Sequence, residues 1–82
     1  MRARVFVTLK TSVFDPQGRT IAEALQSLGY TGVEDVRQGK YFELDLATME
    51  AAQAKALAAE VADKLLANPV IESYRIEVEE AR

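Results

Sequence analysis

The chain has 82 residues, a net charge of −3 at pH 7 and 49% apolar residues. A chain of this length is expected to form one domain, residues 1–82, and buries about two thirds of the surface exposed on unfolding. Association with a second copy or another subunit is therefore expected to add stability. The absence of Cys and His excludes a thiolate nucleophile, a thiolate metal site and a Ser-His mechanism built from this chain alone. The acidic balance argues against nucleic-acid binding, and no apolar run approaches the roughly 20 residues that span a bilayer. We expect a soluble, cytoplasmic protein.

The first predicted element is a strand over 5–9. Val5, Val7 and Leu9 alternate with polar residues, the period of a strand with one buried face. Phe6 places an aromatic ring on the opposite face. That ring indicates either a second layer of packing within the monomer or a subunit interface.

A helix is predicted from Pro16 to Leu28. Asp15 is a favoured N-cap, Pro suits the first helical position, and Gly29 stands where a left-handed C-cap belongs. An apolar stripe at helical spacing is expected to pack on the sheet, and it consists of Ile21, Leu25 and Leu28.

Two strands, 33–37 and 40–46, are predicted to form a hairpin joined at Gln38-Gly39. Phe42, Leu44 and Leu46 point one way and the polar residues between them the other. Gly39 is expected to adopt positive φ in the turn. On that reasoning, Gly39→Val costs on the order of 1–2 kcal/mol through backbone strain.

The next helix is predicted over 51–67, where strong helix formers dominate. Its buried stripe consists of Ala54, Leu57, Ala58, Val61, Ala62 and Leu65, and its alanines let the helix lie close to the sheet. Asn68-Pro69 ends the helix. A last strand opens at Val70-Ile71 and alternates through Val78, before a short polar tail that includes Arg82.

The element order is therefore β-α-β-β-α-β, which predicts an α+β, ferredoxin-like sandwich whose antiparallel sheet carries both helices on one face. Phe6 and Tyr41 are expected on the uncovered face and make it partly apolar. Such a face is typical of an association surface. We expect a homodimer or homotetramer, formed by sheet packing on sheet or by edge pairing with edge.

Four segments together resemble one known family. They are Val7-Thr8-Leu9-Lys10, Asp15-Pro16-Gln17-Gly18, Val36-Arg37-Gln38-Gly39-Lys40 and Leu65-Leu66-Ala67-Asn68-Pro69-Val70-Ile71-Glu72. In this order and spacing they resemble the PurS family, the small subunit of phosphoribosylformylglycinamidine synthase. The resemblance extends over nearly the whole chain.

The resemblance implies a role in de novo purine synthesis. A glutaminase subunit of such an enzyme releases ammonia from glutamine. A large synthetase subunit, which uses ATP and magnesium, converts formylglycinamide ribonucleotide to its amidine with that ammonia. The small subunit is implied to be a homo-oligomeric adaptor between these two partners and to support ammonia transfer. It is expected to have no catalytic residue, no metal site and no cofactor of its own.

The residues support the same interpretation independently. A glutaminase of this type needs a thiolate to form a glutamyl thioester, and this chain has no Cys. No glycine-rich phosphate loop is present, because the four glycines are scattered singly. Glu43 and Asp45 share one strand face but lack a third ligand, so a metal site there is not expected. The chain is left with positioning, enclosure or regulation.

Seven residues in or beside the family-like segments are candidates for a subunit interface: Lys10, Arg37, Lys40, Asn68, Val70, Ile71 and Glu72. Reversing the charges of Arg37 and Lys40 is expected to weaken assembly without disturbing the isolated fold. Two alternatives remain. An ACT-like regulatory domain would bind a small molecule at the loop between the first strand and first helix, but Thr11-Ser12-Val13-Phe14 is bulky there. An RNA-recognition fold would use Phe6 and Tyr41, against the acidic balance.

Overall fold

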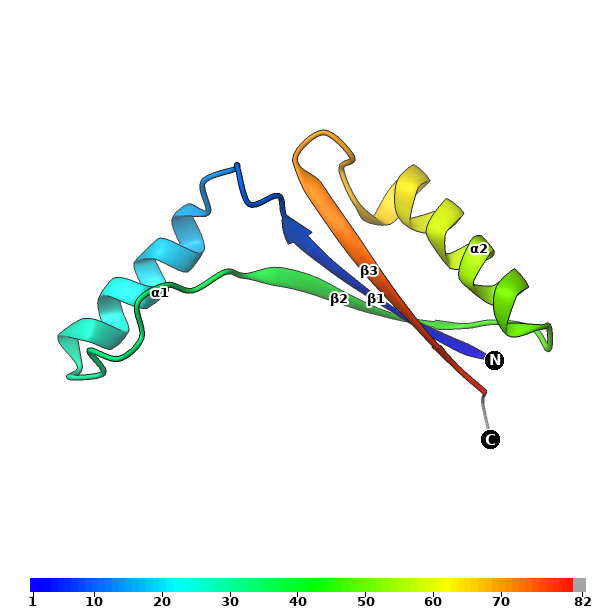
Figure 1. The fold of residues 1–82 in the computed structure, drawn as a ribbon, viewed down its shortest axis with the longest axis horizontal. Helices are drawn as coiled ribbons and strands as arrows, with labels where there is room; N and C mark the ends of the chain where they lie inside the picture. The colour runs from blue at the N-terminus through cyan, green and yellow to red at the C-terminus, as the bar shows by residue number, and fades with distance from the viewer. Residues whose placement is uncertain (81–82) are drawn as a thin grey trace.

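The computed structural model describes residues 1–80; Arg82, in the predicted polar tail, lies outside them. Three strands, β1 (Arg2–Leu9), β2 (Gly39–Asp45) and β3 (Glu72–Glu79), form one antiparallel sheet in the order β2-β1-β3. The helices are α1 (Pro16–Ser27) and α2 (Ala51–Val61), and α2 continues into a π-helical turn, η1 (Ala62–Leu66). As Figure 1 shows, α2 lies along the sheet while α1 lies beyond the sheet's end.

The core lies between β1 and α2 and is built from small side chains. Ala3, Val5 and Val7 on β1 are fully buried, which confirms the burial predicted for Val5 and Val7 from their alternation. They face the fully buried alanines of the second helix, which are Ala54, Ala58 and Ala62. Half-buried side chains of β2 and β3, including Phe42, Leu44 and Ile76, close the cluster. Small residues on both sides let α2 and the sheet approach closely, which confirms the role predicted for these alanines.

The π-helical turn changes which side chains of the second helix face the core. The Ala67 N–H donates to Ala62 O at 2.9 Å, an i to i−5 hydrogen bond that widens the turn. Leu65, predicted to be buried, is 81% exposed, whereas Leu66 packs against the core. A stripe drawn at 3.6 residues per turn cannot anticipate this shift, because the wider turn changes the helical phase of the residues that follow it.

The first helix has the predicted ends but not the predicted packing. Gly29 takes the expected left-handed conformation, with φ of 101°. The stripe expected on the sheet is not buried there, since Ile21 is 39% and Leu28 74% exposed. Burial within α1 is confined to Gly18 and Ala22. The prediction that α1 packs on the sheet of its own chain is therefore wrong.

The segment 33–37 was predicted as a strand, and residues 33–38 are irregular instead. No hairpin turn forms at Gln38-Gly39, and among residues 1–80 positive φ occurs at Gly29 rather than at Gly39. Gly39 is instead the first residue of β2, paired with Thr8. A Cβ there would lie 2.3 Å from Val7 O, so glycine is needed for close approach and not for a left-handed turn. The α+β class and the ferredoxin-like arrangement are confirmed, with this segment in the place of the second strand.

The sheet face opposite α2 is more polar than predicted. Phe6 and Tyr41 do lie on it, with ring centroids 5.0 Å apart. The Arg75 guanidinium stacks over the Phe6 ring, 4.1 Å from its centroid, and also pairs with Glu77. Ion pairs cover the rest of the face, namely Arg2 with Glu43 and Asp45, and Arg4 with Glu79. The aromatic pair is therefore set within charged neighbours.

The lone chain is extended. Its radius of gyration is 16.0 Å, whereas a compact chain of this length has about 12 Å. The dimensions of 48 × 30 × 14 Å and the position of α1 in Figure 1 account for the difference. No helix within residues 1–80 is long and apolar enough to cross a membrane.

Candidate functional site

The family-like segments meet at one end of the sheet, where β1 finishes and β2 and β3 begin. We call this the motif end; it comprises residues 9–18, 36–40 and 66–72. All seven candidate interface residues lie in it, although the sequence separates the first from the last by about 60 positions. The alignment of the strands explains the convergence, because β1 runs antiparallel to both of its neighbours.

Asp15 joins the start of α1 to the irregular segment. It is 5% exposed. One carboxylate oxygen accepts the Gly18 N–H at 2.9 Å, the predicted N-cap bond, and the other accepts the Gln38 N–H at 2.8 Å. The Gln38 and Gly18 amides hold the pKa of the Asp15 carboxyl below its ordinary value. The second bond was not foreseen, because local spacing cannot show which distant amide a cap will also accept.

Gly18 lets α1 lie close to the irregular segment, because it has no side chain at the point of contact. A Cβ at this position would lie 2.0 Å from Val36 O, far inside contact distance. The Gln38 side chain adds a bond to Gln17, with Nε2 donating to Oε1 at 2.9 Å. The second and third family-like segments, Asp15–Gly18 and Val36–Lys40, are therefore two halves of one junction, which fixes α1 relative to β2.

Arg37 is exposed, and its side chain bonds to the backbone of its own chain. Its guanidinium donates to Lys10 O at 2.9 Å, to Val13 O at 3.1 Å and, at 3.4 Å, to Leu9 O. It therefore shapes the loop between β1 and α1. Charge reversal at Arg37 would remove these bonds, so we expect it to disturb this loop as well as assembly.

Lys40 and Glu72 hold the loop before β3. The Lys40 ammonium donates to Leu66 O at 3.2 Å and lies 3.5 Å from the Glu72 carboxylate, whose side chain is 14% exposed. Glu72 also accepts the Asn68 N–H at 2.7 Å. The Asn68 side chain accepts the Val70 N–H at 3.0 Å, and Asn68 O accepts the Glu72 N–H at 2.7 Å. The loop is thus fixed by its own hydrogen bonds, and reversing Lys40 would also disturb it.

Three candidates remain available to a partner: Lys10, Val70 and Ile71. Lys10 is exposed, and its backbone N–H donates to Ile71 O at 2.8 Å, while no ion pair within residues 1–80 engages its ammonium group. Val70, at the apex of the loop, is 76% exposed, and Ile71 beside it is 39% exposed. The motif end therefore presents a cation and an apolar apex on a rigid frame.

The surface depressions are open to solvent, and they offer few free side chains for binding or catalysis. A depression of about 220 Å³ at the motif end is lined by residues that include Lys40, Glu72 and Gln38. The loop 11–14, with Arg19 and Arg37, borders another of about 310 Å³, where an ACT-like domain would hold its ligand. Its arginines are already bonded to their own chain, Arg19 to Glu23 and Arg37 to the carbonyls above.

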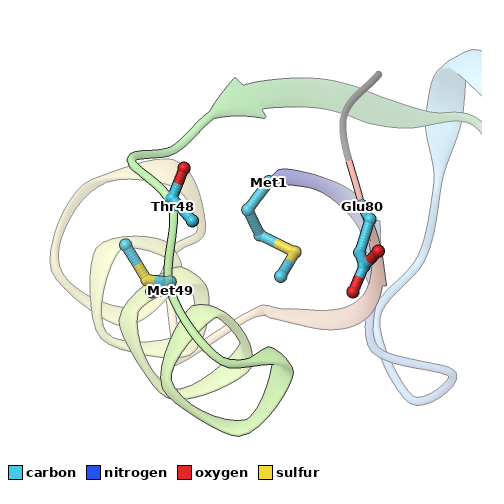
Figure 2. Close-up of a pocket in the computed structure, with 4 residues that line it drawn as sticks. All are labelled: Met1, Thr48, Met49 and Glu80. Carbon is cyan, nitrogen blue, oxygen red and sulfur yellow. The ribbon is translucent and has the colours of Figure 1, made fainter.

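A third hollow, of about 230 Å³, lies at the opposite end of the sheet. Figure 2 shows the Met1 side chain between Thr48 and Met49 on one side and Glu80 on the other. Within residues 1–80, no group of three or more His, Cys, Asp or Glu side chains is placed to hold a metal ion. Glu43 and Asp45 are instead paired with Arg2.

Comparison with known proteins covers nearly the whole chain. Residues 2–80 match the family model PurS, described as phosphoribosylformylglycinamidine (FGAM) synthase. The chain is 49% identical over 79 residues to subunit PurS of this synthase from Bacillus subtilis, covering 96% of this chain and 93% of the relative. It is 48% identical to the Synechocystis subunit, covering 92% of this chain and 75% of the relative.

Solved structures agree with the sequence relatives. The Bacillus subtilis PurS structure matches with a TM-score of 0.85, covering 96% of this chain and 98% of that one. Methanocaldococcus jannaschii PurS, one of the subunits of formylglycinamide ribonucleotide amidotransferase in purine biosynthesis, matches with a TM-score of 0.88 at 38% identity, covering 99% and 98%. A chain in PurLQS from Thermotoga maritima matches with a TM-score of 0.84 at 28% identity, covering 93% of each chain.

Proposed function

The chain belongs to the PurS family of phosphoribosylformylglycinamidine synthase subunits, and we propose that it holds the catalytic subunits of that synthase together without performing chemistry itself. It is a subunit of a ligase in purine biosynthesis. The proposed partners are a glutaminase, which releases ammonia, and a large synthetase, which uses ATP and magnesium to convert formylglycinamide ribonucleotide to its amidine. The likeness to a chain of PurLQS supports a complex of this kind.

The side chains of this protein support a non-catalytic role. Glutamine hydrolysis through a thioester requires a cysteine, and the sequence has none. Phosphoryl transfer from ATP requires a phosphate-binding loop and a bound metal. The acidic side chains of the open sheet face are paired with arginines of the same face, so they are poorly placed to serve as free ligands. Catalysis is accordingly assigned to the partners.

The observation that carries the proposal is the construction of the motif end. Asp15, Arg37, Lys40 and Glu72 use their charges to fix the backbone of three separate segments. A surface that is rigid before binding loses less conformational entropy on association. Lys10 and Val70 project from this frame, and we assign them to contact with a catalytic subunit.

Self-association is the second part of the proposal. Eight apolar residues are buried in the described part of the chain, six of them alanine, and its radius of gyration exceeds that of a compact domain. Meanwhile α1 exposes Ile21 and Leu28. A second copy that covers this stripe would supply the apolar burial that one chain lacks. We therefore propose a homo-oligomer, with a dimer as its smallest form.

The experiment combines the purified chain with the two catalytic subunits, ATP, magnesium, glutamine and formylglycinamide ribonucleotide. Omitting the chain is expected to abolish most glutamine-dependent product formation, while ammonia-dependent formation by the synthetase persists. An equal rate without the chain would contradict the adaptor role.

Two variants test the motif end in a capture assay with the same catalytic subunits. Lys10→Glu and Val70→Asp are expected to weaken capture of the catalytic subunits at least tenfold without changing the melting temperature. Lys55→Glu is the matched control, because Lys55 is an exposed lysine of α2, away from the motif end. Loss of capture in the control as well would point to net charge rather than to this surface.

A further inference from the structure

The end of the second helix leaves regular α-helical geometry at a single turn. η1 (Ala62–Leu66) closes with an i to i−5 hydrogen bond, from the Ala67 N–H to Ala62 O at 2.9 Å. In a regular α-helix the same N–H would bond to the carbonyl of Asp63, four residues before it. The wider turn therefore holds one residue more than an α-turn, and such turns are frequent at functional sites. A slip of one residue would restore the regular helix.

This slip would exchange two identical side chains. Leu65 is 81% exposed, whereas its neighbour Leu66 packs against the core. The core-facing side of the helix is marked by three fully buried alanines, Ala54, Ala58 and Ala62. At about 100° per residue, a regular helix would bring Leu65 to about 20° from the middle of that face and turn Leu66 about 80° away from it. Because both residues are leucine, the core would receive the same side chain in either register.

The contacts that favour the observed π-register lie at the motif end rather than in the core. The Lys40 ammonium donates to Leu66 O at 3.2 Å. The Asn68 N–H, two residues further along, donates to the Glu72 carboxylate at 2.7 Å. Both bonds depend on the direction in which the chain leaves the helix, which the slip would rotate. Hydrogen bonds at an exposed surface contribute little net stability, because water replaces them when they break. The free-energy difference between the two registers is therefore small.

We propose that the end of α2 is a switch between two registers. In the π-register Leu66 lies in the core, and the hydrogen bonds of the loop before β3 are formed. In the α-register Leu65 takes the place of Leu66, and those bonds are broken. Intermediate rotations leave neither leucine in the core, so the two registers are discrete states rather than the ends of a continuous movement.

The switch connects the packing of α2 with the motif end. A ligand shifts such an equilibrium only through contacts that differ between the two states. Lys40 and Glu72 make contacts of this kind, since their bonds to the end of the helix exist in the π-register. A subunit that docks on the motif end would therefore select the π-register. This coupling rests on the proposed function, whereas the two registers themselves are a property of the isolated chain.

Urea unfolding of the isolated chain, at one fixed protein concentration, tests the exchange of the two leucines. Leu65→Ala is expected to change the equilibrium constant of unfolding less than twofold, because the side chain is 81% exposed. In a Leu66→Ala background the same substitution is expected to raise that constant at least tenfold, since Leu65 then occupies the core. An equal effect of Leu65→Ala in both backgrounds would overturn the proposal, whether its cause is permanent exposure or cover by a second copy.

Val70→Ala is the matched control, because Val70 is a 76% exposed apolar residue of the adjoining loop. Its effect on the unfolding constant should be below twofold in both backgrounds. A tenfold effect of Val70→Ala in the Leu66→Ala background would show general loosening of the loop and would count against an exchange of leucines.

Deletion of Leu65 provides a second measurement, because Leu66 then stands at its place in the sequence and the helix becomes regular. The deletion variant is expected to stay folded, with an unfolding constant within about tenfold of that of the wild type. Deletion of Lys55, in the regular part of α2, should raise the constant more than a hundredfold, because it turns the rest of the helix out of phase. Equal losses for the two deletions would refute an accessible α-register.

The same folded variant tests the coupling to the motif end. Capture of the catalytic subunits by the Leu65 deletion is expected to fall at least tenfold, since the bonds of the loop before β3 are not formed. Full capture would refute the coupling. A wild-type chain that captures neither subunit would count against the adaptor role instead, and the unfolding measurements on the isolated chain would be unaffected.

Discussion

Replacement of Gly18 by alanine separates two physical effects of opposite sign. Gly18 lies inside α1, where alanine is favoured over glycine by about 1 kcal/mol in an ordinary helix. Helix propensity alone therefore predicts a more stable protein. However, the added Cβ would lie 2.0 Å from Val36 O, and 2.9 Å from an Asp15 carboxylate oxygen. This steric clash predicts a less stable protein.

The size of the clash decides the outcome. Ordinary contact between carbon and a carbonyl oxygen is about 3.3 Å, so Val36 O must retreat by more than 1 Å. The obstacle is backbone, which is itself held through the Gln38 N–H on Asp15 at 2.8 Å. Overpacking of this kind costs about 1–3 kcal/mol, and we place it near the top of that range. After the gain in propensity, Gly18→Ala is expected to destabilise the chain by about 1–2 kcal/mol, or about 5–15 °C in melting temperature.

Thermal unfolding followed by circular dichroism, at one fixed protein concentration, measures the effect. Gly32→Ala is the matched control, because a Cβ at Gly32 meets nothing within 4 Å and its φ is not positive. That variant should be unchanged or stabilised by about 0.4–1 kcal/mol. If Gly18→Ala gains stability as Gly32→Ala does, the packing of Val36 against α1 is refuted.

Substitutions at three further positions follow from the structure. Gly39→Val should lower stability by about 1–3 kcal/mol, because its side chain meets Val7 O and Thr8 rather than because of positive φ; Gly39→Ala should also be destabilising, as seen in urea unfolding. Ala58→Leu should cost about 1–3 kcal/mol, since Ala58 is fully buried against β1, and an unchanged urea midpoint would contradict that packing. Asp15 has a pKa lowered from its ordinary 3.8, so its stabilisation is complete above that pH and is lost as the pH falls through the folded pKa. The melting temperature of the wild type should therefore drop below pH 4 more steeply than that of Asp15→Asn; parallel curves would argue against the role of the carboxylate.

Local signals in the sequence predicted most elements correctly. The alternation at Val5 and Val7, the cap at Asp15 and the left-handed Gly29 are all confirmed. Each depends on residues within a few positions of one another. The buried alanines of α2 were predicted for the same reason, because helical spacing and small size act over a single element.

The errors share a different cause. Leu65 was misplaced because a single π-turn shifts the helical phase. Val33–Arg37 has the composition of a strand, yet other bonds hold this segment as an irregular connection. Asp15 accepts the Gln38 N–H, the Gln38 side chain donates to the Gln17 side chain, and Arg37 donates to carbonyls of the loop before α1. The apolar stripe of α1 was predicted to pack on the sheet of its own chain, where the structure does not bury it. A sequence cannot show whether the surface that covers such a stripe belongs to the same chain.

The sequence motifs indicated which residues form the candidate site but not what each of them does there. Of the cations chosen for an interface, Arg37 and Lys40 are bonded within the chain, whereas Lys10 remains available. A charged residue in a recognisable motif has the same sequence signature in both cases. What distinguishes them is whether backbone carbonyls converge on the side chain, and only the fold determines that.

Stability and assembly are coupled in this protein by the distribution of its contacts. Polar groups of the motif end are satisfied within the chain, whereas the stripe of α1 and the edge of β3 are not. The core that remains is lined mainly by alanine, which contributes little apolar area per residue. Any partner that binds the folded form alone raises stability by mass action. The melting temperature of the isolated chain is therefore expected to rise with protein concentration between about 1 and 100 µM, by the amount that the self-association measured under the same conditions predicts. A melting temperature independent of concentration over this range would mean that the extended single chain supports its own fold.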